Sequence, residues 1–362
     1  MPDPIRLLIL GTGAMARLHV RHFKTMTHVE IVAGVDSSQQ RLDAFCDLHG
    51  IEHRFSRLQD AIAWGGFDAA CNVTPDSVHY PTTMQLVAAG KHVFCEKPLA
   101  TNHAHAMEMA AAVERAGLVG MVNLTYRNVP AIQKARELVL GGAIGEVRHV
   151  EASYLQSWLT SPHWGDWRTT PAWLWRLSRS HGSNGVLGDI GIHILDFASY
   201  GVASEVEDMT CRLKTFHKAD NDRIGEYLLD ANDSFVMSVE FANGALGVIH
   251  ASRFATGYVD DLALRIFGTL GSAEVSFGHP EPGAPERLSR LRVCLGEDRQ
   301  TQTWTELPLD PVETNYQRFA RAIIEGRTLE PSFAHAANLQ RLLDRGLAAE
   351  RSDPGETFVA HA

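Results

Sequence analysis

The stretch IRLLILGTGAMA, residues 5–16, carries the strongest fold signal in the chain. Its first half is a continuous apolar run of the kind that lies buried on both faces of a parallel sheet. Its second half places two glycines, Gly11 and Gly13, between this strand and a helical pattern. Gly11 suits a tight turn, Gly13 lets the backbone approach a pyrophosphate, and Ala16 lets the helix lie close to the strand. The stretch therefore predicts a strand–turn–helix unit that binds a dinucleotide, against the alternative that the glycines serve a plain turn.

Strand-like and helical segments alternate from this first unit up to about residue 124. Strands that alternate with helices of this length predict a parallel, doubly wound sheet. The further predicted strands are 29–35, 67–73, 91–96 and 118–124, and the clearest helices between them are 79–90 and 103–117.

Asp36 ends the second predicted strand, at the position that discriminates between cofactors. A carboxylate there accepts hydrogen bonds from the adenosine ribose hydroxyls and repels a 2′-phosphate. Ser37 and Ser38 follow with no arginine immediately adjacent, which favours NAD. Arg41 lies one helical turn further on, so NADP is not excluded.

The alternation stops after residue 124. One helix is predicted within 128–147, and β-like segments follow, with hairpin turn signals at 242–245 and 269–272. We therefore predict an α/β protein with an N-terminal Rossmann domain over residues 1–124 and an α+β domain over residues 125–362. The second domain is expected to hold a largely antiparallel open sheet. Two terminal helices, within 311–350, are expected to pack at the domain junction.

The stretch GVLGDIGIHILDFASYG, residues 185–201, is an apolar helical pattern interrupted by Asp189, His193 and Asp196. Asp189 and His193 are four residues apart and share a face if the helix has begun by Asp189. Asp189 could equally cap the helix, with His193 as a satisfied core histidine. A metal pair is a third interpretation, but two ligands do not make a site. A proton-transfer pair and a cap remain equally open from these residues alone.

Composition narrows the function classes. The net charge of −10 argues against a nucleic-acid partner, and no apolar run is long enough to span a bilayer. The N-terminus enters the first strand at once, so no signal peptide is expected. Five cysteines are scattered without paired spacing, which is typical of reduced thiols. We expect a cytoplasmic protein without a metal site.

Four motifs together resemble the Gfo/Idh/MocA family of oxidoreductases. They are GTGAMA at 11–16, TPDSVHYP at 74–81, CEKPLA at 95–100 and GVLGDIGIHILD at 185–196, and they occur in the family's order. Most members oxidise or reduce sugars and polyols with NAD or NADP. The resemblance also implies a homodimer or homotetramer formed through the open sheet of the second domain.

The resemblance implies that Lys97, Asp189 and His193 are the catalytic residues, with Lys97 beside the nicotinamide and a cis bond before Pro98. Hydride leaves a carbinol carbon only as its hydroxyl proton is removed, and a neutral histidine such as His193 is a natural base at neutral pH. The Lys97 ammonium would stabilise the developing alkoxide. Asp189 would orient Lys97 or His193, or hold a second hydroxyl.

Several residues near these motifs are predicted to touch the cofactor. Glu96 is expected near the nicotinamide ribose, and the loop at Thr74 and Pro75 near the cofactor. For His79, a place beside the cofactor and a structural place in the first helical turn are both open. The predicted cofactor-binding residues are Gly11, Gly13, Ala14, Met15, Asp36, Ser37, Thr74, Pro75, His79, Glu96 and Lys97.

A tryptophan cluster is the main substrate signal. Five of the seven tryptophans lie between Trp158 and Trp175. Aromatic faces pack against the C–H faces of cyclic sugars, but such a cluster also staples loops or subunits. The pattern resembles the subgroup that acts on inositols, levoglucosan and related cyclic polyols, and His181 stays unassigned. The predicted substrate-binding residues are Tyr126, Arg127, Gln156, Trp158, His163 and Arg176.

These observations predict a sugar or cyclic-polyol dehydrogenase that uses NAD. Two alternatives share the fold: an NAD-dependent glycoside hydrolase, in which oxidation is transient, and a non-catalytic dinucleotide sensor. Sensors typically lose the catalytic residues, which are all present here.

Overall fold

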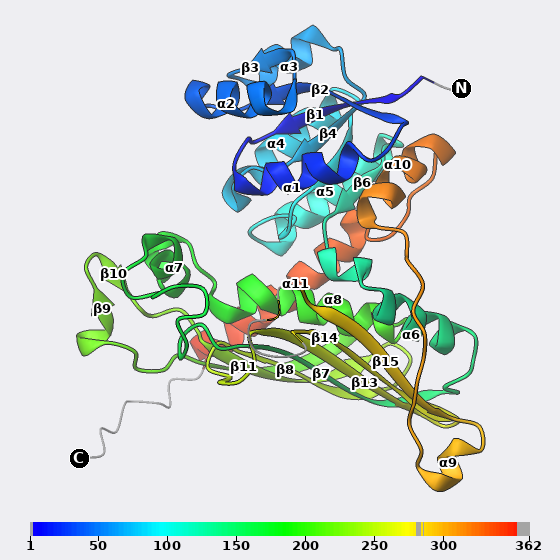
Figure 1. The fold of residues 1–362 in the computed structure, drawn as a ribbon. Coiled ribbons are helices and arrows are strands. Elements are labelled where there is room, and N and C mark those ends of the chain that lie inside the picture. The colour runs from blue at the N-terminus through cyan, green and yellow to red at the C-terminus, as the bar shows by residue number, and fades with distance from the viewer. Residues whose placement is uncertain (1–2, 280–283, 285, 353–362) are drawn as a thin grey trace. The chain divides into compact units, whose positions relative to one another are not determined.

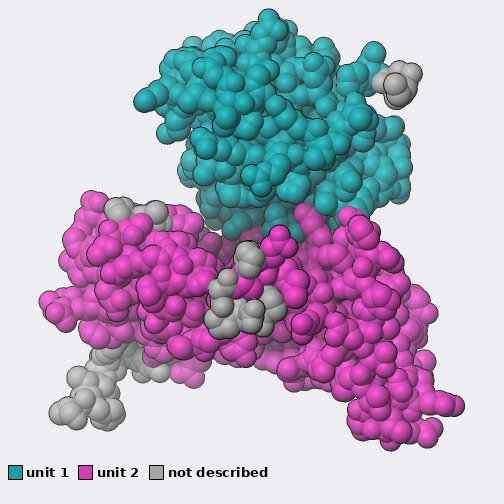
Figure 2. Space-filling model, in the orientation of Figure 1, with its two compact units in different colours: residues 1–125, 313–341 teal, residues 126–312, 342–362 magenta. Residues whose placement is uncertain are grey.

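The computed structural model describes residues 3–279, 284 and 286–352 and divides into two units. The first unit comprises residues 1–125 and 313–341, and the second comprises residues 126–312 and 342–362. Figure 2 draws the first in teal and the second in magenta.

The first unit is built on a six-stranded parallel sheet in the order β3-β2-β1-β4-β5-β6. This confirms the predicted doubly wound sheet, whose strand order reverses between β1 and β4 as in a dinucleotide-binding fold. Its central strand, β1, is buried apart from Arg6. The strands are β1 Ile5–Leu10, β2 Val29–Val35, β3 His53–Phe55, β4 Ala69–Asn72, β5 His92–Cys95 and β6 Gly120–Val122.

Helices flank this sheet, and one of them comes from the far end of the chain (Figure 1). That helix, α10, begins with a capping box between Thr314 and Gln317. Phe319 of α10 packs its ring 5.3 Å from that of Phe94, so α10 completes the core of the first unit. The helices of this unit are α1 Ala14–Phe23, α2 Gln39–His49, α3 Leu58–Trp64, α4 Asp76–Ala88, α5 His103–Arg115 and α10 Asn315–Glu325.

The second unit contains an eight-stranded sheet in the order β16-β15-β14-β13-β7-β12-β11-β8. Only the β7–β12 pair is parallel among these strands, which confirms the largely antiparallel prediction. Both predicted hairpins form, β11–β12 and β13–β14. The strands are β7 Val147–Gln156, β8 Val206–Lys214, β11 Ser234–Phe241, β12 Leu246–Ser252, β13 Asp260–Gly268, β14 Gly271–Gly278, β15 Leu288–Leu295 and β16 Thr305–Glu306.

Helices cover one face of this sheet and leave the other exposed (Figure 1). Burial alternates along β11, where Phe235 and Met237 are buried and Val236 between them is 56% exposed. This alternation is the mark of an antiparallel sheet with one solvated face. The covering helices are α6 Pro130–Leu140, α8 Ile192–Gly201 and the C-terminal part of α11 Phe333–Ser352.

A tryptophan-rich insertion lies beside the sheet and has its own small core. Trp158, Trp167 and Leu177 are buried there, with Leu229 from a second loop. Its short elements are α7 Pro171–Leu174, β9 Arg223–Ile224 and β10 Tyr227–Leu228, and a further short helix, α9 Asp298–Thr301, follows β15. Among the residues that the structure describes, no helix is long and apolar enough to cross a membrane.

Candidate functional site

The turn after β1 has the geometry that a dinucleotide needs. Gly11 has φ +89°, and a Cβ there would lie 2.7 Å from the carbonyl oxygen of Val73, so only glycine fits. A Cβ on Gly13 would meet nothing within 4 Å, so the start of α1 is open to an approaching group. Ala14 and Met15 form the exposed first turn of α1, whose N–H groups and dipole favour an anion.

Asp36 lies directly after β2, and protein donors surround its carboxylate. Oδ2 accepts hydrogen bonds from the backbone N–H and the hydroxyl of Thr12 at 2.9 and 2.8 Å. Oδ1 accepts from the Ser38 N–H at 2.8 Å and from Arg41 at 2.9 Å. Burial raises the pKa of Asp36, but Arg41, Ser38 and Thr12 together lower it to about 2. The site thus presents an ionised carboxylate beside a guanidinium whose side chain is 61% exposed.

The loop after β4 is held from within. The Asn72 amide oxygen accepts a hydrogen bond from the Thr74 hydroxyl at 2.7 Å, and Pro75 stands at the N-cap of α4. The His79 side chain is fully buried in the first turn of α4, with each ring nitrogen 2.8 Å from a backbone carbonyl oxygen. This position favours the structural interpretation of His79 over direct contact with a cofactor.

The Glu-Lys-Pro motif follows β5, and the Lys97–Pro98 bond is cis, as the resemblance implies. Glu96 Oε1 lies 2.7 Å from the His19 ring and accepts a hydrogen bond from Asn123 at 2.7 Å. Oε2 accepts from the Lys97 N–H at 3.1 Å. Burial raises the pKa of Glu96, but His19, Asn123 and Lys97 lower it to about 2. Glu96 therefore anchors the loop that carries Lys97.

In the second unit, Asp189 lies inside a π-helical turn, Leu187–Gly191, that runs directly into α8. Because the N-cap of this turn is Val186, Asp189 is not the helix cap that was one of the sequence interpretations. Single π turns are frequent at functional sites. Asp189 is one-third exposed, and His193 is mostly buried.

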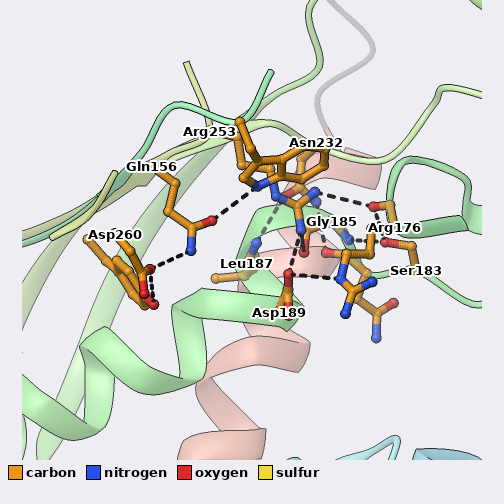
Figure 3. Close-up of polar contacts among 12 residues, drawn as sticks. Gln156, Arg176, Ser183, Gly185, Leu187, Asp189, Asn232, Arg253 and Asp260 are labelled. Carbon is orange, nitrogen blue, oxygen red and sulfur yellow. Dashed lines mark hydrogen bonds and ion pairs between the residues drawn. The ribbon is translucent and has the colours of Figure 1, made fainter. Parts of the chain in front are cut away.

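Arg253 is the residue that fixes Asp189, as Figure 3 shows. It follows β12, its side chain is fully buried, and it donates to Asp189 Oδ2 at 2.9 Å. It also donates to the Arg176 carbonyl oxygen at 3.2 Å and lies over the Trp158 ring at 4.9 Å. The Arg176 side chain approaches Asp189 at 3.8 Å. Two guanidinium groups therefore face this carboxylate.

A second polar chain begins beside His193. The rings of His193 and Tyr126 meet edge to face with centroids 4.8 Å apart. The Tyr126 and Tyr154 hydroxyls lie 2.5 Å apart, and Tyr154 donates to Asp260 at 2.6 Å. Burial raises the pKa of Tyr126, so its hydroxyl keeps its proton at neutral pH.

The predicted substrate-binding residues separate into groups. Gln156 donates a hydrogen bond to Asp260 at 2.8 Å (Figure 3). Gln156 also accepts a hydrogen bond from Trp158, whose ring lies against Arg253, so Gln156 and Trp158 belong to the network around Arg253. Arg127 is buried and forms a two-pronged pair with Asp196, which favours a structural role for Arg127 over contact with a substrate. His163, also predicted to bind substrate, is exposed near the Trp164 and His279 rings. His181, which the sequence left unassigned, has its ring 4.3 Å from that of Tyr227.

Three residues of these networks were missed from the sequence: Arg253, Tyr154 and Asp260. Each belongs to a strand or follows one directly, so its neighbours in sequence give no sign of its partner. The one available signal was Arg253, a lone charge behind the alternating strand LGVIHAS. Among the described residues, no group of three or more His, Cys, Asp or Glu side chains could hold a metal ion.

Comparison with known proteins agrees with this geometry. Residues 5–124 match the family described as "Oxidoreductase family, NAD-binding Rossmann fold". Residues 132–274 match the "GFO/IDH/MocA C-terminal domain".

Curated relatives match over most of their length. A levoglucosan dehydrogenase of Pseudarthrobacter phenanthrenivorans is 28% identical over 297 residues, 72% of each chain. A myo-inositol 2-dehydrogenase of Thermotoga maritima is 26% identical over 74% of each chain. Among solved structures, an oxidoreductase domain protein from Kribbella flavida is 28% identical, with a TM-score of 0.82 over 97% of this chain and 98% of that one.

Proposed function

This chain belongs to the GFO/IDH/MocA family of NAD-binding oxidoreductases, and we propose that it transfers a hydride between NAD and a ring alcohol or ketone of a cyclic polyol or sugar. The observation that carries the proposal is the dinucleotide turn at Gly11 and Gly13 with Asp36 behind it, in a chain whose relatives are sugar and inositol dehydrogenases. NAD, when bound, supplies the hydride chemistry.

We assign Lys97 the stabilisation of developing negative charge on the substrate oxygen. The Lys97 N–H donates a hydrogen bond to Glu96, and Glu96 is itself hydrogen-bonded to His19 and Asn123. These contacts hold the Lys97 backbone in place at the end of β5. Ligands of parallel sheets bind at this carboxyl edge. A preorganised cation placed there stabilises an alkoxide without reorganisation during the reaction.

We assign His193 the removal of the hydroxyl proton and Asp189 the orientation of the substrate. The Tyr126 ring packs against His193 and limits the orientations its imidazole can take. Asp189 is anchored by Arg253 and still one-third exposed, so it can accept hydrogen bonds from substrate hydroxyls. A fixed carboxylate of this kind suits a polyol better than an apolar alcohol.

The aromatic residues around Arg176 support a cyclic substrate. The Arg176 guanidinium lies 5.2 Å from the Trp173 ring centroid and 4.7 Å from that of Trp175. Trp158 is buried in the insertion core, so its role there is packing and the orientation of Gln156. We propose that Arg176, Gln156 and Asp189 bind hydroxyl groups and that the exposed Trp175 face contacts ring C–H groups.

The open sheet face supports a homo-oligomer. Val236 and Leu246 project from adjacent strands on this face and are 56% and 55% exposed. We propose that a second copy of the chain covers them. Light scattering of the wild type and of Val236→Glu tests this. The substitution would place a negative charge on the contact face of each copy, and repulsion between the two faces would separate the copies.

The function is tested by NADH formation with a panel of myo-inositol, levoglucosan and methyl glucosides, run in parallel with NADP. We expect NAD reduction with one or two cyclic polyols. If none reduces either cofactor while NADH still binds, the sensor becomes the better description. Cleavage of a glycoside without net NADH would instead identify a hydrolase.

A further inference from the structure

His79 has an unusual set of hydrogen-bond partners. Its side chain is fully buried, with Nδ1 2.8 Å from the carbonyl oxygen of Pro98 and Nε2 2.8 Å from that of Thr74. Thr74 belongs to the loop after β4, and Pro98 belongs to the loop after β5 that carries Lys97. The ring therefore ties together two loops at the carboxyl edge of the sheet.

The two carbonyl groups decide how many protons the ring carries. A carbonyl oxygen only accepts hydrogen bonds, and a neutral imidazole has a single N–H donor. With a neutral ring, one nitrogen lone pair would face a carbonyl lone pair at 2.8 Å, with no hydrogen between them. Both contacts are hydrogen bonds only when both nitrogens are protonated.

We infer that His79 is a buried imidazolium at neutral pH and that its charge makes the enzyme bind NADH more tightly than NAD⁺. The inference rests on NAD as the cofactor and is independent of which sugar is the substrate.

The groups around His79 determine whether a buried imidazolium is stable there. Burial and the positive end of the α4 dipole both oppose a cation. Two short bonds to carbonyl dipoles favour it, as do the nearby Cys95 and Asp76 side chains. Burial lowers the pKa of His79, but Cys95, the Pro98 carbonyl and Asp76 raise it, to about 10.

The position of this charge in the fold affects the relative affinity of the site for the oxidised and the reduced cofactor. In a sheet of this order, the half around β1 to β3 takes the adenosine end of a dinucleotide and the half around β4 to β6 takes the nicotinamide. The nicotinamide ring is cationic when oxidised and neutral when reduced. A fixed cation under the β4 and β5 loops therefore disfavours NAD⁺ alone. Two unit charges about 10 Å apart, at an effective dielectric constant near 20, change an affinity by roughly tenfold.

The protonation state is tested by NMR of the wild-type chain with ¹⁵N-labelled histidine. We expect the two ring nitrogens of His79 to give imidazolium signals at pH 8, where ordinary histidines are neutral. The resonances are assigned by their loss in His79→Gln. If His79→Gln does not fold, sequential resonance assignment of the wild-type chain identifies the same two ring nitrogens. A neutral tautomer at pH 8 would therefore overturn the inference in either case.

The consequence is tested by the dissociation constants of NAD⁺ and NADH, measured by calorimetry. In His79→Gln we expect the ratio of the NAD⁺ constant to the NADH constant to fall roughly three- to tenfold. His92→Gln is the matched control, because the His92 ring accepts a hydrogen bond from the Val119 N–H at the opposite end of β5. An unchanged ratio in folded His79→Gln would contradict the inference, whereas loss of affinity for both forms alike would show a purely structural role.

Discussion

Lys97 is the residue on which the proposed chemistry most depends. In Lys97→Ala, turnover should fall on the order of a hundredfold or more, because the charge that stabilises the alkoxide is lost. NADH affinity should change only slightly, since Glu96 and its anchors remain. Steady-state kinetics and NADH titration measure the two quantities separately. Lys91→Ala is the control, because Lys91 bonds the Phe67 carbonyl at the other end of β5. Equal losses of turnover and affinity would mean that Lys97 holds the cofactor instead.

Arg41 is the residue that bears on the choice between NAD and NADP. Its guanidinium pairs with Asp36 but is largely exposed, so it can turn toward a 2′-phosphate. In Arg41→Ala, kcat/KM with NADP should fall roughly tenfold while kcat/KM with NAD falls less. The control is Arg54→Ala, which removes the guanidinium paired with Asp43 and Asp47. A parallel loss with both cofactors would show that Arg41 only holds Asp36 in place.

The individual residues were predictable to different extents. Asp36 was recognisable because it directly follows the second predicted strand, a place that local sequence sets. Lys97 was recognisable only through its family motif, CEKPLA. Arg253 was not, since its partner Asp189 lies 64 positions away and only the fold brings them together. Arg127 was predicted to bind substrate, but its buried pair with Asp196 depends on packing that the sequence around Arg127 does not reveal.

At the scale of elements, the turn between β1 and α1 contains one glycine that the fold requires, Gly11, and one that cofactor binding requires, Gly13. Gly11→Ala should destabilise the protein on the order of 1–3 kcal/mol, because its Cβ would meet the Val73 carbonyl at a positive φ. Gly13→Ala has free space and ordinary backbone angles, so it should cost under about 1 kcal/mol. It should nevertheless weaken NADH binding severalfold or more. Thermal unfolding and NADH titration of both variants check this, and full NADH affinity in Gly13→Ala would contradict the proposed pyrophosphate position.

The π turn and β12 form one cooperative contact through Asp189 and Arg253. Arg253→Met should destabilise the chain by roughly 3–5 kcal/mol, because it leaves a partly buried carboxylate without its main partner. Adding Asp189→Asn should recover part of that loss of stability. Urea unfolding of the wild type, the two single variants and the double variant measures the coupling energy between Arg253 and Asp189. Arg265→Met, which breaks exposed pairs on the open sheet face, should cost under about 1 kcal/mol. Strict additivity would show that Arg253 acts only through its packing on Trp158.

Elements with local signals were the most predictable. The two hairpins follow from Gly-containing turns between alternating strands, and the parallel sheet follows from the strand–helix alternation. The π turn at Leu187–Gly191 carries no such signal, because an inserted residue in a helix is stabilised by tertiary contacts. The parallel β7–β12 pair also escaped prediction, since its strands are about a hundred residues apart and their pairing has no turn to mark it.

For the whole molecule, two largely buried carboxylates, Asp36 and Glu96, predict sensitivity to acid. Asp36 and Glu96 each have a pKa of about 2 in the folded chain, below the ordinary 3.8 and 4.5. Their stabilisation is therefore present above about pH 4.5 and is lost as the pH falls toward 2. We expect each to contribute on the order of 2 kcal/mol, measured as the drop in the free energy of urea unfolding between pH 5 and pH 2.5. Asp36→Asn should make the free energy of unfolding depend less on pH. An unchanged pH dependence in this variant would contradict an ionised Asp36 held by its hydrogen bonds.

The whole chain was less predictable than its halves. The sequence distinguishes an alternating first part from a β-rich second part, but α10 belongs to the core of the first unit although it follows the second in sequence. Its hydrophobic face gives no sign of which core it joins, because Phe319 would fit any apolar surface. Packing determines that the chain returns to the first unit at α10, and only the structure reveals this.

The most direct test of the proposed function follows a deuterium atom placed on the ring carbinol carbon of the substrate that reduces NAD best. Hydride transfer to nicotinamide predicts one deuterium in each NADH formed, and one ketone for each NADH, as measured by mass spectrometry. Glycoside cleavage with no labelled NADH accumulating, or NADH without label, would contradict the account.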